Sequence, residues 1–205
     1  QLDNGATVDA EHVVLTTPAP VSAKLLERLA PAASAALASV VFAPLAVTAL
    51  GFHAPSSTSG THDLGMDLAA YGFVVARGEG VDLLGCQYES SIFEHRAPPG
   101  AALLRALQGG TFRPELVDAT DDELATRAVA DLRRVAGLRA TPDFVAVWRH
   151  PAGIPQYDLG HGARVRALED ALRPLPRLHV IGQATSGVGL NDGIAGAAAL
   201  ARSFA

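Results

Sequence analysis

Residues 178–194 read LHVIGQATSGVGLNDGI, a short apolar run that leads into a segment rich in glycine. The pattern predicts a buried strand, a tight turn, and then a terminal alanine-rich helix over residues 191–204. This succession presents unpaired backbone N–H groups at the helix start, where they can bind an anion. Gly187 and Gly189 would let such a ligand approach the backbone closely. The stretch therefore predicts an α/β arrangement with a candidate binding site at its turn.

The glycines by themselves do not identify a ligand. Gly187, Gly189 and Gly193 follow the spacing G-x-G-x-x-x-G, which is longer by one position than the dinucleotide-binding fingerprint. A second strand with a ribose-binding acid does not follow them in this chain. A glycine-rich turn before a helix is also typical of a plain tight turn, capped here by Asn191 or Asp192. Both interpretations stay open from these residues alone.

The preceding chain alternates apolar runs with turn residues, which predicts a mixed sheet with helices. The clearest helix covers residues 120–137, because Thr120 and Glu123 form a capping-box pattern and Gly137 suits its C-terminal end. The expected apolar stripe of this helix consists of Leu124, Ala128, Val129, Leu132 and Val135. Further helices are expected over residues 163–172 and over 21–29, the latter with Leu25, Leu26 and Leu29 on one face. The expected strands cover residues 12–16, 40–52, 71–76, 82–88, 101–107 and 144–149, and an irregular loop follows to residue 157.

Composition argues against several classes of protein. The 205 residues carry 16 Lys and Arg against 21 Asp and Glu, a net charge of −5, so no nucleic acid is expected as a partner. No apolar stretch reaches the roughly 20 residues that a transmembrane helix needs. Cys86 is the only cysteine, which excludes a disulfide within the chain and favours a reducing compartment, the cytoplasm. The seven histidines form no pair at i, i+2 or i, i+4, so no metal is expected.

Two motifs resemble those of one known family. The string GVGLNDGI at residues 187–194 is similar to G-V-G-L-P-D-C-I, which opens the final helix of protoporphyrinogen oxidases. The string IPQYDLGH at residues 154–161 matches the family pattern I-P-Q-Y-x-x-G-H without a gap. Residues 10–20 resemble the family's strand A-D-H-V-I-x-A-x-P-A, and shorter matches lie in the same order between these segments. The resemblance therefore covers nearly the whole chain.

This resemblance implies a two-domain flavoenzyme of the p-hydroxybenzoate hydroxylase and amine oxidase type, with an α/β (mixed α+β) fold. Residues 1–38 and 156–205 would belong to a discontinuous FAD-binding domain. Residues 39–155 would form a substrate-binding domain, a mixed sheet backed by helices. The family's GxGxxG segment and ribose-binding Glu are absent from this chain, which opens without Met on turn residues. We therefore expect a fragment that is inactive alone.

The same resemblance assigns site residues. The cofactor FAD would contact the glycine-rich turn through Gln183, Val188, Gly189 and Leu190. There, a helix N-terminus would stabilise the negative charge of a reduced flavin. The apolar porphyrinogen substrate would lie against Gly72, Val74, Gln87 and Leu107. The family usually has an apolar residue where Gln87 stands, and no residue of the chain is assigned as a general base, so the catalytic residues stay unknown.

The implied reaction is the oxidation of protoporphyrinogen IX to protoporphyrin IX in haem biosynthesis, with hydride transfer to flavin N5 and reoxidation by oxygen. Coproporphyrinogen, which differs in its number of propionates, is an alternative substrate. Other amine-oxidase-type flavoenzymes are a second alternative, although an amine oxidase would need an aromatic cage and the chain has one Trp and three Tyr. A catalytically silent porphyrin-binding fragment is a third. A homodimer and peripheral membrane association stay open.

Overall fold

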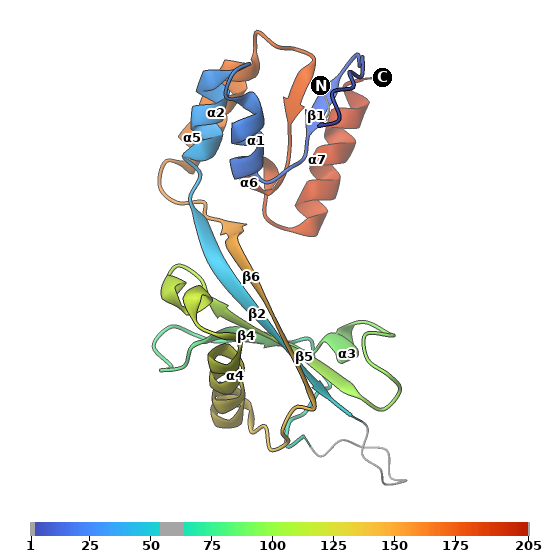
Figure 1. Cartoon of the computed structure of the whole chain (residues 1–205), viewed down its shortest axis with the longest axis vertical. Helices are drawn as coiled ribbons and strands as arrows, with labels where there is room; N and C mark the ends of the chain where they lie inside the picture. Colours follow the sequence, from blue (N-terminus) through green and yellow to red (C-terminus); the bar gives the residue numbers. More distant parts are fainter. Residues whose placement is uncertain (1–2, 54–63, 205) are drawn as a thin grey trace. The chain divides into compact units, whose positions relative to one another are not determined.

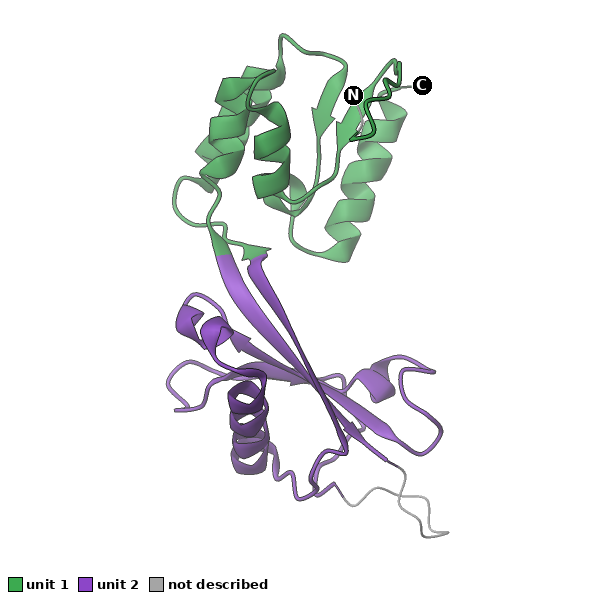
Figure 2. Cartoon of the chain, viewed as in Figure 1, with its two compact units in different colours: residues 1–42, 154–205 green, residues 43–153 purple. Residues whose placement is uncertain are grey.

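A computed structural model describes residues 3–53 and 64–204 of the chain. The chain forms two compact units, one from residues 1–42 and 154–205 and the other from residues 43–153 (Figure 2). The bounds of these units lie near the expected domain bounds at residues 38 and 155. The assignment of one unit to FAD and of the other to substrate stays a prediction.

The unit of residues 43–153 is built on a five-stranded sheet with the order β3-β4-β5-β2-β6 (Figure 1). The neighbours β3 and β4, β4 and β5, and β5 and β2 run antiparallel. The strands are β2 (Phe42–Phe52), β3 (Gly72–Val74), β4 (Leu83–Gln87), β5 (Ala102–Gly109) and β6 (Phe144–Pro155). Two short helical segments, α3 (Glu89–Ile92) and η1 (Pro114–Asp118), follow β4 and β5 and were not expected from the sequence.

Helix α4 (Asp121–Ala136) begins and ends where its local sequence predicts. The Thr120 hydroxyl accepts the Glu123 N–H, and the Glu123 carboxylate accepts the Thr120 N–H in return. The Thr120 N–H and hydroxyl both donate to the Glu123 carboxylate, and these two bonds lower the pKa of Glu123. Gly137 ends the helix with a φ of 76°, a left-handed conformation that glycine adopts without steric cost.

One face of the sheet packs on α4 (Figure 1). Ala128 and Leu132 of α4 belong to the same core cluster as Leu50, Leu104 and Ala106 of the sheet, and all five are fully buried. Since side chains along a strand alternate between the two faces, the intervening residues of β5 point to the opposite face. The prediction that Val135 belongs to the buried apolar stripe of α4 is wrong, because this residue is 42% exposed.

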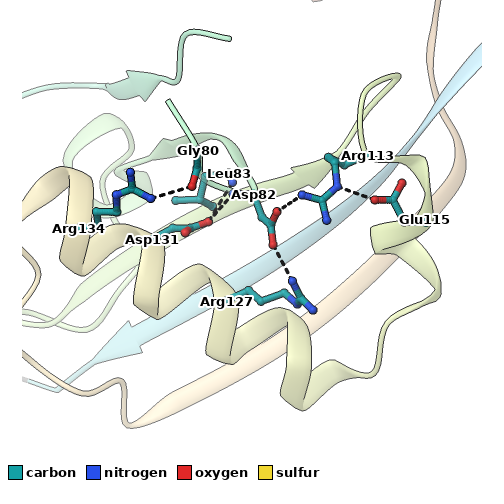
Figure 3. Close-up of polar contacts among 8 residues, drawn as sticks. All are labelled: Gly80, Asp82, Leu83, Arg113, Glu115, Arg127, Asp131 and Arg134. Carbon is teal, nitrogen blue, oxygen red and sulfur yellow. Dashed lines mark hydrogen bonds and ion pairs between the residues drawn. The ribbon is translucent and has the colours of Figure 1, made fainter. Parts of the chain in front are cut away.

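A polar network ties α4 to the start of β4 (Figure 3). The Asp131 carboxylate accepts the backbone N–H groups of Asp82 and Leu83 at 2.8 and 3.1 Å. The Asp82 carboxylate, on a side chain that is 15% exposed, pairs with Arg127 at 2.8 Å and also with Arg113. Burial raises the pKa of Asp131, although the two backbone N–H groups act in the opposite direction. The network fixes the hairpin of β3 and β4 to the helix.

The second unit combines three packed helices with a two-stranded sheet. Helices α1 (Ala19–Leu26), α2 (Pro31–Ala38) and α5 (His161–Leu172) share one core cluster. Strand β1 (Val13–Leu15) pairs in parallel with β7 (Leu178–Val180), and β7 leads into α6 (Gln183–Ser186) and α7 (Leu190–Arg202). Parallel and antiparallel pairs thus occur together with helices, and the predicted mixed α/β fold is confirmed.

The first helix differs from its prediction in both its bounds and its buried face. Of the three leucines expected on one face, only Leu26 is buried, whereas Leu25 and Leu29 are 58% and 62% exposed. The buried face is instead made of Leu26 and small residues such as Ala23, whose carbonyl accepts the Ser34 hydroxyl of α2 at 2.7 Å. Small side chains let the two helices approach closely, which an apolar pattern dominated by leucine does not reveal.

Three strand predictions also need correction. Strand β6 continues to Pro155 through the expected irregular loop, which its position at the edge of the sheet permits because an edge strand tolerates Pro. The runs 12–16 and 178–182, expected as buried strands, are short in the structure, and Val13 is 47% exposed. No helix in the described part of the chain is long and apolar enough to cross a membrane.

Candidate functional site

The turn between β7 and α7 has a conformation that only glycine allows at one position. Gly187 has a φ of 117°, and a Cβ atom there would lie 2.5 Å from Cγ of Asp192. The Asp192 carboxylate accepts the Gly189 N–H at 3.0 Å, so Gly189 is the N-cap of α7 and the helix begins at Leu190. Asp192 therefore contributes to the cap from inside the first turn, rather than as the capping residue itself.

Tyr157 holds this turn from a distant part of the sequence. Its hydroxyl donates to the Gln183 carbonyl at 2.6 Å and accepts the Gly187 N–H at 2.8 Å. The Gln183 side-chain amide donates to the Val188 carbonyl at 3.1 Å. The ring of His161 stacks on that of Tyr157 with 3.9 Å between the ring centres and 13° between the planes. One motif of the sequence, residues 154–161, thus supports the other, residues 187–194.

The second candidate region lies on the sheet of the other unit. Leu107 pairs with Gly85, which pairs with Val74 of the next strand. Arg105 pairs with Gln87, which pairs with Gly72. Directly paired residues of neighbouring strands point to the same face. The expected substrate residues Gly72, Val74, Gln87 and Leu107 therefore share the face that points away from α4, which we call the open sheet face.

Polar groups on the open sheet face are bound to one another. The Gln87 side-chain carbonyl accepts the Arg105 Nε–H at 2.9 Å. The Nε atom of Arg105 also lies 3.0 Å from the carboxylate of Glu89, and the Glu89 side chain is only 8% exposed. Cys86 lies on the opposite face, and burial raises the pKa of its thiol to about 12. The thiol is therefore protonated at neutral pH and unsuited to nucleophilic chemistry.

The sequence profile of one family, described as flavin containing amine oxidoreductase, matches residues 1–203. The chain belongs to this family. A solved structure from Exiguobacterium sp. 255-15, provisionally assigned as a protoporphyrinogen oxidase, superposes with a TM-score of 0.71 at 30% identity, over 95% of this chain and 41% of its own. Cyclohexylamine oxidase from Brevibacterium oxydans IH-35A has the same fold, with a TM-score of 0.66 at 15% identity, over 98% of this chain and 44% of its own.

Curated relatives within the flavin amine oxidoreductase family are named for porphyrinogen oxidation. Coproporphyrinogen III oxidase of Bacillus subtilis (strain 168) is 32% identical over 94% of this chain and 39% of its own length. Protoporphyrinogen oxidase 1, chloroplastic, of Spinacia oleracea is 34% identical over 95% of this chain and 35% of its own length. The predicted relationship to these oxidases is confirmed, and the chain spans well under half of either relative.

The residues around the turn fit the flavin for which the family is named. Val188 and Leu190 are 45% and 82% exposed, and α7 has no buried residue in the described part of the chain. Next to them, the first turn of α7 directs backbone N–H groups outward, since the first N–H groups of a helix have no acceptor within it. An apolar ring with an electron-rich edge matches this combination of apolar side chains and N–H donors. That Gln183, Val188, Gly189 and Leu190 contact the flavin stays a prediction.

The substrate residues likewise share a surface, but their contact with substrate stays a prediction. Val74 is 88% exposed, whereas Gly72, Gln87 and Leu107 are partly buried. Gly72 has a φ of 126°, and a Cβ atom there would lie 2.0 Å from the Cys86 carbonyl oxygen, so the backbone itself requires glycine. Sequence reasoning missed Arg105, because its partners Gln87 and Glu89 lie on other elements and no local pattern marks it. Tyr157 lies within the motif of residues 154–161, but its bonds to Gln183 and Gly187 do not follow from that motif.

Proposed function

We propose that this chain forms the carboxyl-terminal part of the FAD-binding domain and the substrate-binding domain of a protoporphyrinogen oxidase that uses oxygen. The observation that carries the proposal is the match, along nearly the whole chain, to relatives named as porphyrinogen oxidases. The two candidate regions suit that activity, since one offers N–H groups beside apolar side chains and the other an open sheet face.

FAD, when bound, supplies an acceptor for the hydride removed from the porphyrinogen, and oxygen takes up the electrons afterwards. The chain's contribution at the turn is positional and electrostatic. The N-terminal end of α7 carries partial positive charge, which stabilises an anion held beside it. Val188 and Leu190 would cover the cofactor with apolar side chains and exclude water. Tyr157 and Gln183 keep the turn in the conformation that presents these groups.

The open sheet face would supply a surface for an apolar macrocycle. Leu107 contributes an apolar side chain, and Gly72 and Gly85 leave the strands beside it without side chains. Binding sites for apolar ligands combine such surfaces with few polar groups that fix orientation. The polar groups at this face include Gln87, Arg105 and Glu89, which bind one another and would position the substrate rather than accept its protons.

Coproporphyrinogen is the second candidate substrate. The relative from Bacillus subtilis, matched over 94% of this chain, is named for that substrate. The two porphyrinogens share the macrocycle and differ in the number of propionates at its edge. Apolar contacts with the shared macrocycle would not separate the two, so discrimination would fall to charged groups around it.

A comparison of both substrates with the complete gene product tests the proposed function. Under anaerobic conditions, protoporphyrinogen IX should bleach the visible flavin absorbance, and admission of air should restore it as porphyrin fluorescence develops. Absence of bleaching by either porphyrinogen would contradict porphyrinogen oxidation altogether. A larger kcat/KM for coproporphyrinogen III would overturn the choice of protoporphyrinogen and keep the class of reaction.

A further inference from the structure

A cavity of about 230 Å³ lies at one end of the five-stranded sheet, within the unit of residues 43–153. Apolar residues such as Leu103, Phe144 and Pro98 form much of its lining. Two residues that can carry positive charge, His53 and Arg96, also line it. A cavity with this lining favours a ligand that is apolar over most of its surface and negatively charged at one end.

The cavity continues the open sheet face. Gly51 and Leu103, which both line the cavity, are directly paired across β2 and β5. Leu103, Arg105 and Leu107 alternate along β5, so all three point to the open sheet face. Phe144 lies on the same side, since a Cβ atom at Gly51 would be 3.1 Å from its Cβ. A ligand that lies against Leu107 can therefore extend along β5 into the cavity.

The basic side chains near this end of the sheet differ in how they are paired. Arg105 is paired with Glu89. His53 lies 3.2 Å from the Asp143 carboxylate through Nδ1, and its backbone N–H donates to the same oxygen at 2.8 Å. Arg96 has no ion-pair partner within residues 3–53 and 64–204, and its guanidinium lies 5.4 Å from the centre of the Phe93 ring. Among the described residues that line the cavity, Arg96 is therefore the basic residue without an ion-pair partner.

On the basis of the proposed function, we infer that this cavity binds a propionate carboxylate of the porphyrinogen and that Arg96 is the group that recognises its charge. The macrocycle would lie on the open sheet face, and the propionate at its edge would reach the cavity. A guanidinium suits a carboxylate because its N–H groups match the two oxygens in geometry and charge. Arg96 would act in binding and would not take part in hydride transfer.

Binding of protoporphyrin IX and of its dimethyl ester to the complete gene product tests this inference. Esterification removes the negative charge of the propionates and leaves the macrocycle unchanged. The ratio to be measured is the Kd of the ester divided by the Kd of the free acid. The Arg96→Gln variant should lower this ratio about fivefold, which is the magnitude expected for an ion pair that is partly exposed to water. Arg133→Gln is the matched control, because Arg133 is exposed on α4, away from the open sheet face, and its loss should leave the ratio unchanged.

The outcomes separate this inference from the proposed function. If neither porphyrin binds saturably to the unmodified protein, the proposed function fails, and the inference fails with it. If both bind and Arg96→Gln leaves the affinity ratio unchanged, the inference alone is overturned. Equal weakening of acid and ester would also overturn it, since that result assigns Arg96 to the shape of the cavity. Thermal denaturation curves of both variants should match that of the unmodified protein.

Discussion

A single hydroxyl group, that of Tyr157, connects the two sequence motifs of this chain. It bonds to backbone groups at both ends of α6, the Gln183 carbonyl and the Gly187 N–H. Each such hydrogen bond contributes about 0.5–1.5 kcal/mol, so the two bonds together favour one conformation of the turn. The stacked ring of His161 further restricts the tyrosine ring. Tyr157 is thus a positioning residue for the turn expected to bind flavin.

Replacement of Tyr157 by Phe should weaken FAD binding to the complete gene product. The ring and its stacking on His161 would remain, but the turn would lose both hydrogen bonds to the hydroxyl. We expect the Kd for FAD to rise about tenfold, which corresponds to about 1.4 kcal/mol. Titration of the apoprotein with FAD, followed by flavin fluorescence, measures the change.

Tyr71→Phe provides the matched control, because Tyr71 is 77% exposed and lies in the other unit. Its Kd for FAD should equal that of the unmodified protein. A Tyr157→Phe variant with unchanged FAD affinity and an unchanged flavin absorption spectrum would show that the turn keeps its conformation without the hydroxyl.

Sequence reasoning reached these motifs but not the way they cooperate. The glycine pattern at residues 187–193 is local, and Gly187 adopts a φ of 117° that favours glycine. The bond from Tyr157 to Gly187 joins residues 30 positions apart, and its existence depends on how α5 and β7 pack. The same limit applies to Gln87, whose polar side chain was unexpected until the structure placed Arg105 beside it.

At the scale of elements, the position of the β3–β4 hairpin depends on one face of α4. Arg127, Asp131 and Arg134 follow one another at helical spacing and all contact the segment that leads into β4. Arg134 donates to the Gly80 carbonyl at 2.7 Å, and Asp131 accepts the N–H groups of Asp82 and Leu83 (Figure 3). Arg134 also donates to the Glu79 carbonyl at 3.2 Å. The helix thereby substitutes for water around the turn before β4.

Asp131→Ala should lower the free energy of unfolding by about 1–3 kcal/mol, because it leaves the N–H groups of Asp82 and Leu83 without their acceptor. Chemical denaturation followed by circular dichroism measures the loss. Arg133→Ala on the same helix is the control, and it should change stability by less than about 0.5 kcal/mol since that side chain is exposed. Equal stability of the Asp131 and Arg133 variants would mean that water replaces the carboxylate at no cost.

Elements with local signals were predicted with nearly their observed bounds, whereas the buried face of α1 and the course of β6 depend on neighbouring elements and were not predicted. The bounds of helix α4 follow from its local sequence, in which Thr120 and Glu123 cap the N-terminal end and Gly137 ends the helix. Helix α1 buries Ala and Ser against α2, so its face is set by the partner helix rather than by its leucines. Strand β6 can include Pro151 and Pro155 because it lies at the edge of the sheet. The local sequence does not show which strand takes the edge position, so this strand could not be predicted through its prolines.

At the scale of the whole molecule, the unit of residues 1–42 and 154–205 exposes surfaces that a parallel sheet normally buries. Parallel strands are usually covered on both faces, yet Val13 and Val14 of β1 are 47% and 37% exposed. Helix α7 exposes Leu190 and Ile194 at 82% and 60%. The two relatives named above extend well beyond the part that this chain matches, at 39% and 35% of their lengths. We therefore expect further protein to cover these surfaces and to hold the remainder of FAD.

Thermal denaturation with and without FAD tests this expectation. A ligand that binds only the folded state raises Tm, and the rise grows with the ratio of its concentration to Kd. FAD should raise the Tm of the complete gene product by several degrees, because a hundredfold excess over Kd contributes about 2.7 kcal/mol. The 205-residue chain by itself should show no shift at the same FAD concentration, although its circular dichroism should show both helices and strands. An equal shift for both proteins would mean that the turn at residues 187–190 and its neighbours bind the cofactor without further protein, and the exposed faces of β1 and α7 would then need another explanation.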